Sequence, residues 1–156
     1  MDITEQFPKD AEILQEAIIE IPRRDVALLL ETGYLLIEFQ RLKEAEEVFL
    51  GVCALLPKSD APYIALGNLY FSQSEFEKAL NCHKKATELR PESALAHAHM
   101  AECLFSLFKE TEAVAAIEKA LSLEPDGVNA DFAKNLLDMH EAGIWNKFRD
   151  MFGKKK

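Results

Sequence analysis

The stretch ALAHAHMAECLFSLF, residues 94–108, brings several chemically reactive side-chain types close together. Imidazole, carboxylate and thiol groups can ligate a metal ion, or act as acids, bases and nucleophiles in catalysis. The candidates lie within seven residues and are His97, His99, Met100, Glu102 and Cys103. Whether they form a site depends on how the surrounding helix places them.

Helical geometry argues against a metal centre. His97 and His99 are two residues apart, which is about 200° around a helix, so they cannot chelate one ion from the same face. His99 and Cys103 could meet across one turn, but two ligands are too few for structural zinc. We therefore predict that His97 and Cys103 pack in the core, with no metal or cofactor bound. His83 is predicted to be a hydrogen-bonded core histidine, with pH sensing as the alternative.

Composition limits the remaining possibilities. With 156 residues, 49% apolar and 29% charged, the chain suits one globular domain. Its three cysteines show no CxxC pairing, and no apolar signal segment precedes the acidic start, so we expect a cytoplasmic protein. No apolar run approaches the roughly 20 residues needed to cross a bilayer.

Charge is distributed unevenly along the chain. The net charge of −9 argues against nucleic acid as a partner, because a phosphate-binding face needs clustered Lys and Arg. Residues 1–143 hold 13 basic and 26 acidic side chains, whereas residues 144–156 hold 5 basic and 1 acidic. The tail is a basic segment on an acidic body.

Prolines reveal an internal repeat. Pro57, Pro91 and Pro125 are spaced 34 residues apart, and each follows a helical pattern. In three aligned blocks small residues recur where two helices would cross closely. The blocks begin at residues 26, 60 and 94. Their eighth residues are Gly33, Gly67 and Ala101, and their twentieth residues are Ala45, Ala79 and Ala113. This resembles the tetratricopeptide pattern, with two antiparallel helices in each block.

The predicted fold is all-α, with three tetratricopeptide repeats in a right-handed α-solenoid. The repeats are residues 26–59, 60–93 and 94–127, which together form 26–127. Residues 1–25 are predicted to form an N-terminal capping and dimerisation helix. Residues 128–156 are predicted to form a C-terminal capping helix, with Val128, Phe132, Leu136 and Met139 on one stripe, and a basic amphipathic tail.

A second apolar stripe on the first helix of each block predicts a binding groove. Positions 2, 5, 9 and 12 are apolar in ten of twelve cases, and a helix that is apolar on two faces must bury both. The two polar residues of the stripe, Asn68 and Glu102, would hold the backbone of a bound peptide. The predicted groove residues are Leu30, Tyr34, Ile37, Ile64, Asn68, Phe71, Leu95, Glu102 and Phe105.

Two alternatives concern the tail. The C-terminal helix could fold back into the groove and cover it. The tail, with Ile144, Trp145, Phe148 and Phe152 beside basic residues, could also dock on the acidic body or touch an anionic membrane. Docking on the body is favoured because the charges are complementary.

Three segments resemble a known family. They are HMAECLF (99–105), AEEVFLGVCALL (45–56) and YIALGNLYFSQSEFEKAL (63–80), and they resemble the class II chaperones of bacterial type III secretion. The resemblance implies a cytoplasmic, non-enzymatic chaperone that binds an extended segment of a secreted translocator or related secretion protein. It also implies a homodimer formed through the N-terminal helix.

Two other function classes are less consistent with the sequence. An adaptor that clamps a C-terminal carboxylate needs Lys or Arg in the groove, where Leu30 and Leu95 stand instead, although a general protein–protein adaptor remains an alternative. An enzyme is not expected, because no nucleophile, base and orienting group can be assembled and no Gly-rich phosphate loop is present.

The first prediction concerns self-association. Leu14, Ile18 and Ile21 form a broader apolar stripe than a cap requires, so deletion of residues 1–21 should convert a dimer into a monomer in light scattering. A full-length chain that is already monomeric at high concentration would contradict this prediction.

Overall fold

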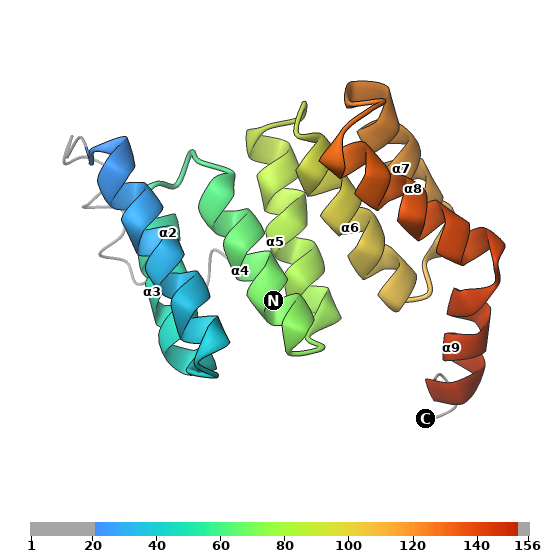
Figure 1. Cartoon of the computed structure of the whole chain (residues 1–156), viewed down its shortest axis with the longest axis horizontal. Coiled ribbons are helices and arrows are strands. Elements are labelled where there is room, and N and C mark those ends of the chain that lie inside the picture. Colours follow the sequence, from blue (N-terminus) through green and yellow to red (C-terminus); the bar gives the residue numbers. More distant parts are fainter. Residues whose placement is uncertain (1–20, 153–156) are drawn as a thin grey trace. The chain divides into compact units, whose positions relative to one another are not determined.

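The structure is a computed structural model that describes residues 21–152, and every regular element in this range is helical. It divides after Arg90 into two compact units, and Figure 1 labels the helices of both. The first unit contains α2 (Arg23–Glu38), α3 (Leu42–Leu55), α4 (Ala61–Ser72) and α5 (Phe76–Leu89). The second contains α6 (Ala94–Ser106), α7 (Glu110–Leu123), α8 (Val128–Glu141) and α9 (Ile144–Phe152).

Three helical hairpins follow the predicted repeat. They are α2–α3, α4–α5 and α6–α7, and α3, α5 and α7 each end two residues before one of the periodic prolines. The helix α2 begins at Arg23, three residues before the predicted first block. Residues 1–20 of the N-terminal helix expected from residues 1–25, with Leu14 and Ile18, lie outside the described residues; Ile21 is half-buried and precedes α2, and residues 23–25 form the start of α2.

The turn inside each hairpin has the same backbone conformation. Gln40, Ser74 and Phe108, again 34 residues apart, have positive φ angles of 60°, 62° and 60°. After each of them the next backbone N–H donates to a carbonyl five residues earlier, at 2.8–2.9 Å between nitrogen and oxygen. This is the left-handed helix ending that usually carries glycine. The three chain reversals are therefore structurally equivalent although their residues differ.

The helices of each hairpin cross where a small residue faces a large one. Gly33 lies against the ring of Phe49, and Gly67 lies against His83. Ala101 and Ile117, the equivalent positions in the second unit, are both fully buried. The predicted small column at Ala45, Ala79 and Ala113 is also fully buried. The prediction of close crossings is confirmed.

The first unit is centred on α4. Leu66, Leu69 and Tyr70 are buried, and the Tyr70 hydroxyl donates to Glu46 of α3 at 2.7 Å. By contrast, Gly33 is the one buried residue of α2. Leu29 and Thr32 of the same helix are exposed.

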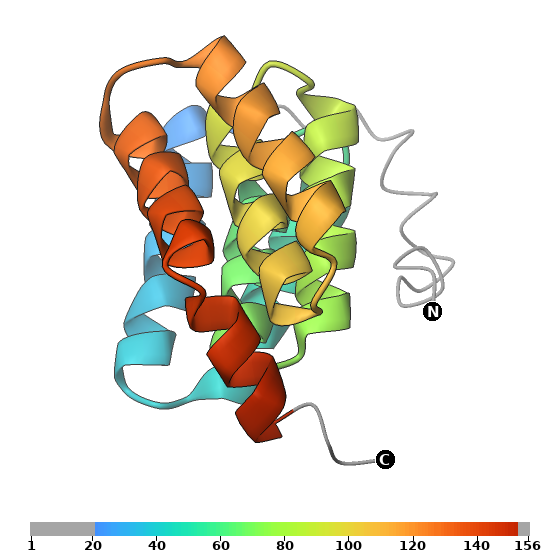
Figure 2. The same cartoon turned by 90° about the vertical axis from the view of Figure 1, so that its right-hand side faces the viewer.

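In the second unit α8 lies beside both α6 and α7, and α9 follows it (Figure 2). The predicted stripe on α8 is only partly buried. Leu136 is buried, and Phe132 and Met139 are half-buried. Val128 is 84% exposed because it begins the helix. No helix within residues 21–152 is both long enough and apolar enough to span a membrane.

The glycine crossing yields the second prediction. A methyl group added at Gly67 would lie 2.5 Å from Cε1 of the buried His83 ring, so Gly67→Ala should lower the free energy of unfolding by about 1–3 kcal/mol. The matched control is Gly51→Ala in the middle of α3, where an added Cβ meets nothing within 4 Å. That change should raise stability by up to about 1 kcal/mol, because alanine is the better helix former. Urea unfolding of both variants measures the difference, and equal effects would contradict the crossing.

Candidate functional site

The reactive-looking residues of α6 do not form one site. The Nε2 atom of His97 lies 3.0 Å from the carbonyl oxygen of Pro91, and Nδ1 of His99 lies 3.4 Å from a carboxylate oxygen of Glu102. Cys103 is fully buried, as predicted, but His97 is only half-buried, so its placement in the core was wrong; Met100 is also half-buried. Among residues 21–152 no group of three or more His, Cys, Asp or Glu side chains could hold a metal ion.

The cysteines behave as core residues. Cys53, Cys82 and Cys103 are free thiols and are buried. Burial raises the pKa of Cys53 to about 12, and burial is also the main cause that raises the pKa of Cys82. A thiol is nucleophilic only as its thiolate, so Cys53 and Cys82 are unsuited to nucleophilic chemistry. His83 on α5 is buried, as predicted.

In the first unit the predicted groove stripes of α2 and α4 meet through Tyr34. Its ring packs edge-on against Phe49, with ring centroids 5.4 Å apart, and its side chain hydrogen-bonds to Asn68. Burial raises the pKa of Tyr34, and the hydrogen bond to Asn68 partly offsets that rise. Tyr34 nevertheless remains 42% exposed, because only one part of its ring is covered. An aromatic ring and an amide are thus fixed together at an accessible surface.

The other predicted groove residues of this unit differ in exposure. Leu30, Ile37 and Phe71 are half-buried, and Phe71 packs against Phe76 of its own hairpin with centroids 5.2 Å apart. Ile64 is only 7% exposed, which corrects the expectation that it lines an open groove. The open part of the stripe is therefore centred on Tyr34 and Asn68.

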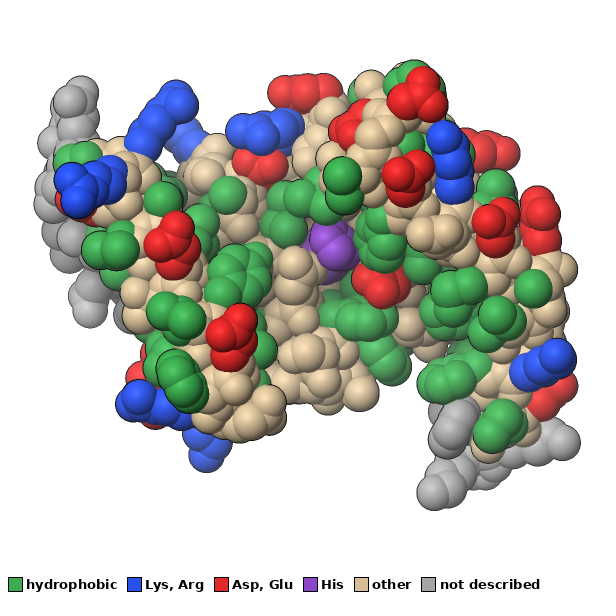
Figure 3. All heavy atoms as spheres, viewed as in Figure 1, with side chains coloured by type: hydrophobic (Ala, Val, Ile, Leu, Met, Phe, Trp, Pro, Cys, Tyr) green, Lys and Arg blue, Asp and Glu red, His purple; other side chains and the backbone are tan. Residues whose placement is uncertain are grey.

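The outer surface of α2 carries exposed apolar side chains that the groove prediction did not include. Leu28, Leu35 and Phe39 are exposed, and Phe39 is 72% exposed. Their heptad-like spacing places them on one side of α2. Hydrophobic side chains gather over α2 in the space-filling view (Figure 3). The spacing of these residues in the sequence could have identified this surface.

In the second unit the C-terminal helices cover the predicted groove. Phe105 is 0% exposed because Trp145 of α9 stacks on its ring, with centroids 5.2 Å apart and planes 3° apart. His140 of α8 contacts the same ring at 5.1 Å between centroids. Leu95 and Glu102 are half-buried. The expectation that Phe105 is an open groove residue was wrong, and the alternative of a tail folded over the third block applies in this unit.

The tail also has an electrostatic contact with the body. Nη1 of Arg149 donates to the Glu110 carboxylate of α7 at 3.2 Å. Ile144, Phe148 and Met151 lie on another side of α9 and are exposed. The side chain of Phe152 lies outside the described part of the chain.

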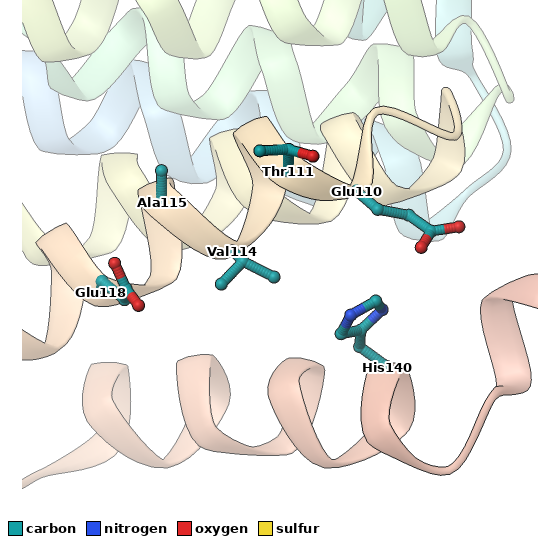
Figure 4. Close-up of a pocket in the computed structure, with 6 residues that line it drawn as sticks. All are labelled: Glu110, Thr111, Val114, Ala115, Glu118 and His140. Atoms are coloured by element: carbon teal, nitrogen blue, oxygen red, sulfur yellow. The ribbon is translucent and has the colours of Figure 1, made fainter.

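A hollow of about 450 Å³ lies between α7 and α8 (Figure 4). Its α7 side presents Glu110, Val114 and Glu118, and His140 faces them from α8. Glu110 is also the partner of Arg149, so the hollow adjoins the contact of the tail. Its acidic wall suits a positively charged side chain.

Comparison with known proteins identifies the repeat. A sequence profile described as TPR repeat matches residues 67–107, and one described as tetratricopeptide repeat matches residues 94–126. The fold is that of tetratricopeptide repeats. Their 34-residue period agrees with the spacing of both the prolines and the positive-φ turns.

Curated relatives match 60% of the chain. The peroxisomal targeting signal receptor of Candida albicans is 34% identical over 98 residues, covering 60% of this chain and 17% of the receptor. The receptor of Kluyveromyces lactis is 30% identical over 95 residues, covering the same shares. The chain spans about a sixth of the length of these relatives.

Solved tetratricopeptide structures resemble the chain over more of their length. The Yersinia enterocolitica type III secretion chaperone SycD, in complex with a peptide of the translocator YopD, has a TM-score of 0.70 at 19% identity, covering 82% of this chain and 98% of that one. The first TPR of Spaghetti (RPAP3), bound to an HSP90 peptide, has a TM-score of 0.67 at 21% identity, covering 80% and 97%. These likenesses show the fold.

The third prediction concerns thiol reactivity. With a pKa of about 12, roughly one Cys53 in 10⁴ is a thiolate at pH 8, and burial also blocks access. The native protein should therefore react with dithiobis(nitrobenzoate) slowly, whereas urea should release three rapidly reacting thiols. A Lys58→Cys variant, with the new thiol at an exposed position, is the control for rapid labelling. Rapid labelling of one native thiol in the unmodified chain would contradict this account.

Proposed function

We propose that this chain is a cytoplasmic peptide-binding chaperone that holds a secreted, translocator-type client of a bacterial type III secretion system before export. The observation that carries the proposal is the accessible stripe of the first unit, where the Tyr34 and Asn68 pair lies among Leu30, Ile37 and Phe71. The likeness to SycD with its bound YopD peptide supports the same kind of client. Self-association through Leu14, Ile18 and Ile21 remains part of the proposal.

The stripe can bind a peptide without any cofactor. Each apolar side chain of a client that it buries would contribute about 1.5–3 kcal/mol of transfer free energy, before the cost of ordering the peptide is subtracted. The Asn68 amide has both donor and acceptor atoms, so it can pair with a main-chain group of an extended segment. Apolar contacts would thus supply the affinity, and one amide would set the register of the peptide. Such binding requires neither a nucleotide nor a catalytic residue. We propose that the chain is not an enzyme.

A second candidate is a general adaptor that recognises a short targeting signal. The observation that favours it is the 34% identity with a peroxisomal targeting signal receptor. The two candidates differ in what they would retain: a secretion chaperone binds one or two dedicated clients, whereas a signal receptor binds many proteins that share one short motif.

The fourth prediction tests the stripe with an isosteric change. Asn68→Asp keeps the shape of the side chain, and its carboxylate can accept a hydrogen bond from the Tyr34 hydroxyl in place of the amide that donates to it, so the free energy of unfolding should change by less than about 1 kcal/mol. Client binding should nevertheless fall at least tenfold, because an apolar peptide would bury an uncompensated carboxylate at a cost of several kcal/mol. The matched control is Asn81→Asp, which adds the same charge on α5 of the same unit.

Affinity capture from the native host, with quantitative mass spectrometry, measures the effect of both variants. Retention of a secreted membrane-inserting protein by the unmodified chain and by Asn81→Asp, with loss from Asn68→Asp, is the expected result. Equal retention by all three chains would show that the client binds a surface other than the one around Asn68. Retention of many proteins with a common terminal motif would instead favour the adaptor.

A further inference from the structure

The helix α9 presents two different anchors from one side. Trp145 stacks on Phe105, and Arg149, one helical turn later, pairs with Glu110. Phe105 lies on the second stripe of α6, at the position equivalent to Phe71 in the preceding repeat. The chain therefore places its own aromatic ring and its own cation on a surface of the second unit that the repeat pattern assigns to a client.

The recipient surface is built from three helices. Phe105 comes from α6, Glu110 begins α7, and His140 comes from α8 with its ring against Phe105. His140 and Glu110 also line the hollow between α7 and α8. An aromatic platform and a carboxylate thus lie side by side next to an open acidic recess.

The docking of α9 is incomplete. Within the described part of the chain, Nε1 of Trp145 is buried without a hydrogen-bond partner, which costs free energy that a solvated indole does not lose. The Arg149 and Glu110 side chains remain 47% and 29% exposed, so water and salt screen their attraction. Met151, on the opposite side, is 74% exposed. A nine-residue helix is also too short to be stable alone, so α9 would lose its structure when it leaves.

We propose that α9 is a built-in, displaceable occupant of a client site in the second unit, and that it reveals the chemistry of the ligand. The site accepts a peptide with a planar aromatic side chain, followed one helical turn later by Lys or Arg. The aromatic ring replaces Trp145 on Phe105, and the cation replaces Arg149 on Glu110. This inference rests on the proposed function, because it describes a second contact region of the same client.

The proposal makes α9 a competitor of the client. While α9 is docked the site is closed, so the apparent affinity of an external peptide is reduced by the fraction of molecules in which α9 has left. A client that also engages the first unit is tethered near the second, and its high effective concentration favours exchange with α9. A peptide that offers only the aromatic ring and the cation should therefore bind weakly to the unmodified chain.

The fifth prediction uses the chain's own tail as the probe. A fluorescein-labelled synthetic peptide of residues 144–156 is added to the full-length protein, and binding is followed by anisotropy. The peptide should bind the Trp145→Ala chain at least tenfold more tightly than the unmodified chain, because the competing ring has been removed. Met151→Ala, a change on the outer side of the same helix, is the matched control and should bind as the unmodified chain does.

Charge reversal tests the second anchor. A peptide with Glu in place of Arg149 should lose at least fivefold in affinity for the Trp145→Ala chain, and it should recover that affinity when Glu110→Lys is added to the chain. Equal affinity of the labelled peptide for the unmodified, Trp145→Ala and Met151→Ala chains would overturn the proposal. The proposal would also be overturned if the peptide bound none of these chains, since α9 would then be a permanent structural cap.

Intrinsic fluorescence provides a separate readout, since Trp145 is the only tryptophan. A peptide with Tyr in place of Trp145 should displace α9 and shift the emission of Trp145 to longer wavelength as the ring becomes hydrated. A shift caused by vesicles of phosphatidylglycerol, but not by the peptide, would overturn the proposal in favour of a membrane contact.

Client capture separates this inference from the proposed function. Trp145→Ala should increase client retention, whereas Asn68→Asp should decrease it. If the peptide exchanges with α9 but Trp145→Ala leaves client retention unchanged, α9 covers a site that the client does not use and this inference fails alone. If Asn68→Asp leaves retention unchanged, the proposed function fails whatever the peptide does.

Discussion

The structure depends on the close crossing of two helices within each hairpin. At these crossings a residue without a bulky side chain must face a large one, as Gly33 faces Phe49 and Gly67 faces His83. The requirement is steric, because a packed interior leaves no room for an extra methyl group. It fixes the rotation of both helices, and therefore decides which of their remaining residues point outward. The accessible pair Tyr34 and Asn68 is a consequence of that rotation, since Tyr34 directly follows Gly33 and Asn68 directly follows Gly67.

The sequence predicted features that follow from local pattern. Helix ends near Pro57, Pro91 and Pro125, and the buried small columns, can be derived from residue type and spacing alone. The equivalent turns at Gln40, Ser74 and Phe108 could not, because none of these residues is the glycine that normally marks a positive φ. Their 34-residue spacing can be seen in the sequence, but their residue types do not indicate a positive φ angle.

Burial that depends on distant segments was also beyond prediction. Phe105 and Phe71 occupy equivalent positions, yet Phe105 is closed off by Trp145, which lies forty residues further along the chain. His97 was predicted to pack in the core, but it is half-buried and its Nε2 atom lies 3.0 Å from the carbonyl oxygen of Pro91. A repeat register predicts what neighbouring hairpins do to one another. It does not predict contacts made by a segment that has no counterpart in the other repeats.

The positive-φ turns bear on how the chain folds. A non-glycine residue in the left-handed conformation costs roughly 1 kcal/mol or more relative to the right-handed one, and Gln40, Ser74 and Phe108 all adopt it. The backbone hydrogen bond that closes each turn offsets part of this cost, and the packing of the two helices that the turn joins offsets the rest. A single helix cut out of a hairpin would therefore lack the packing that holds its turn. Helix formation, chain reversal and the closing of the helix crossing are therefore coupled within each hairpin.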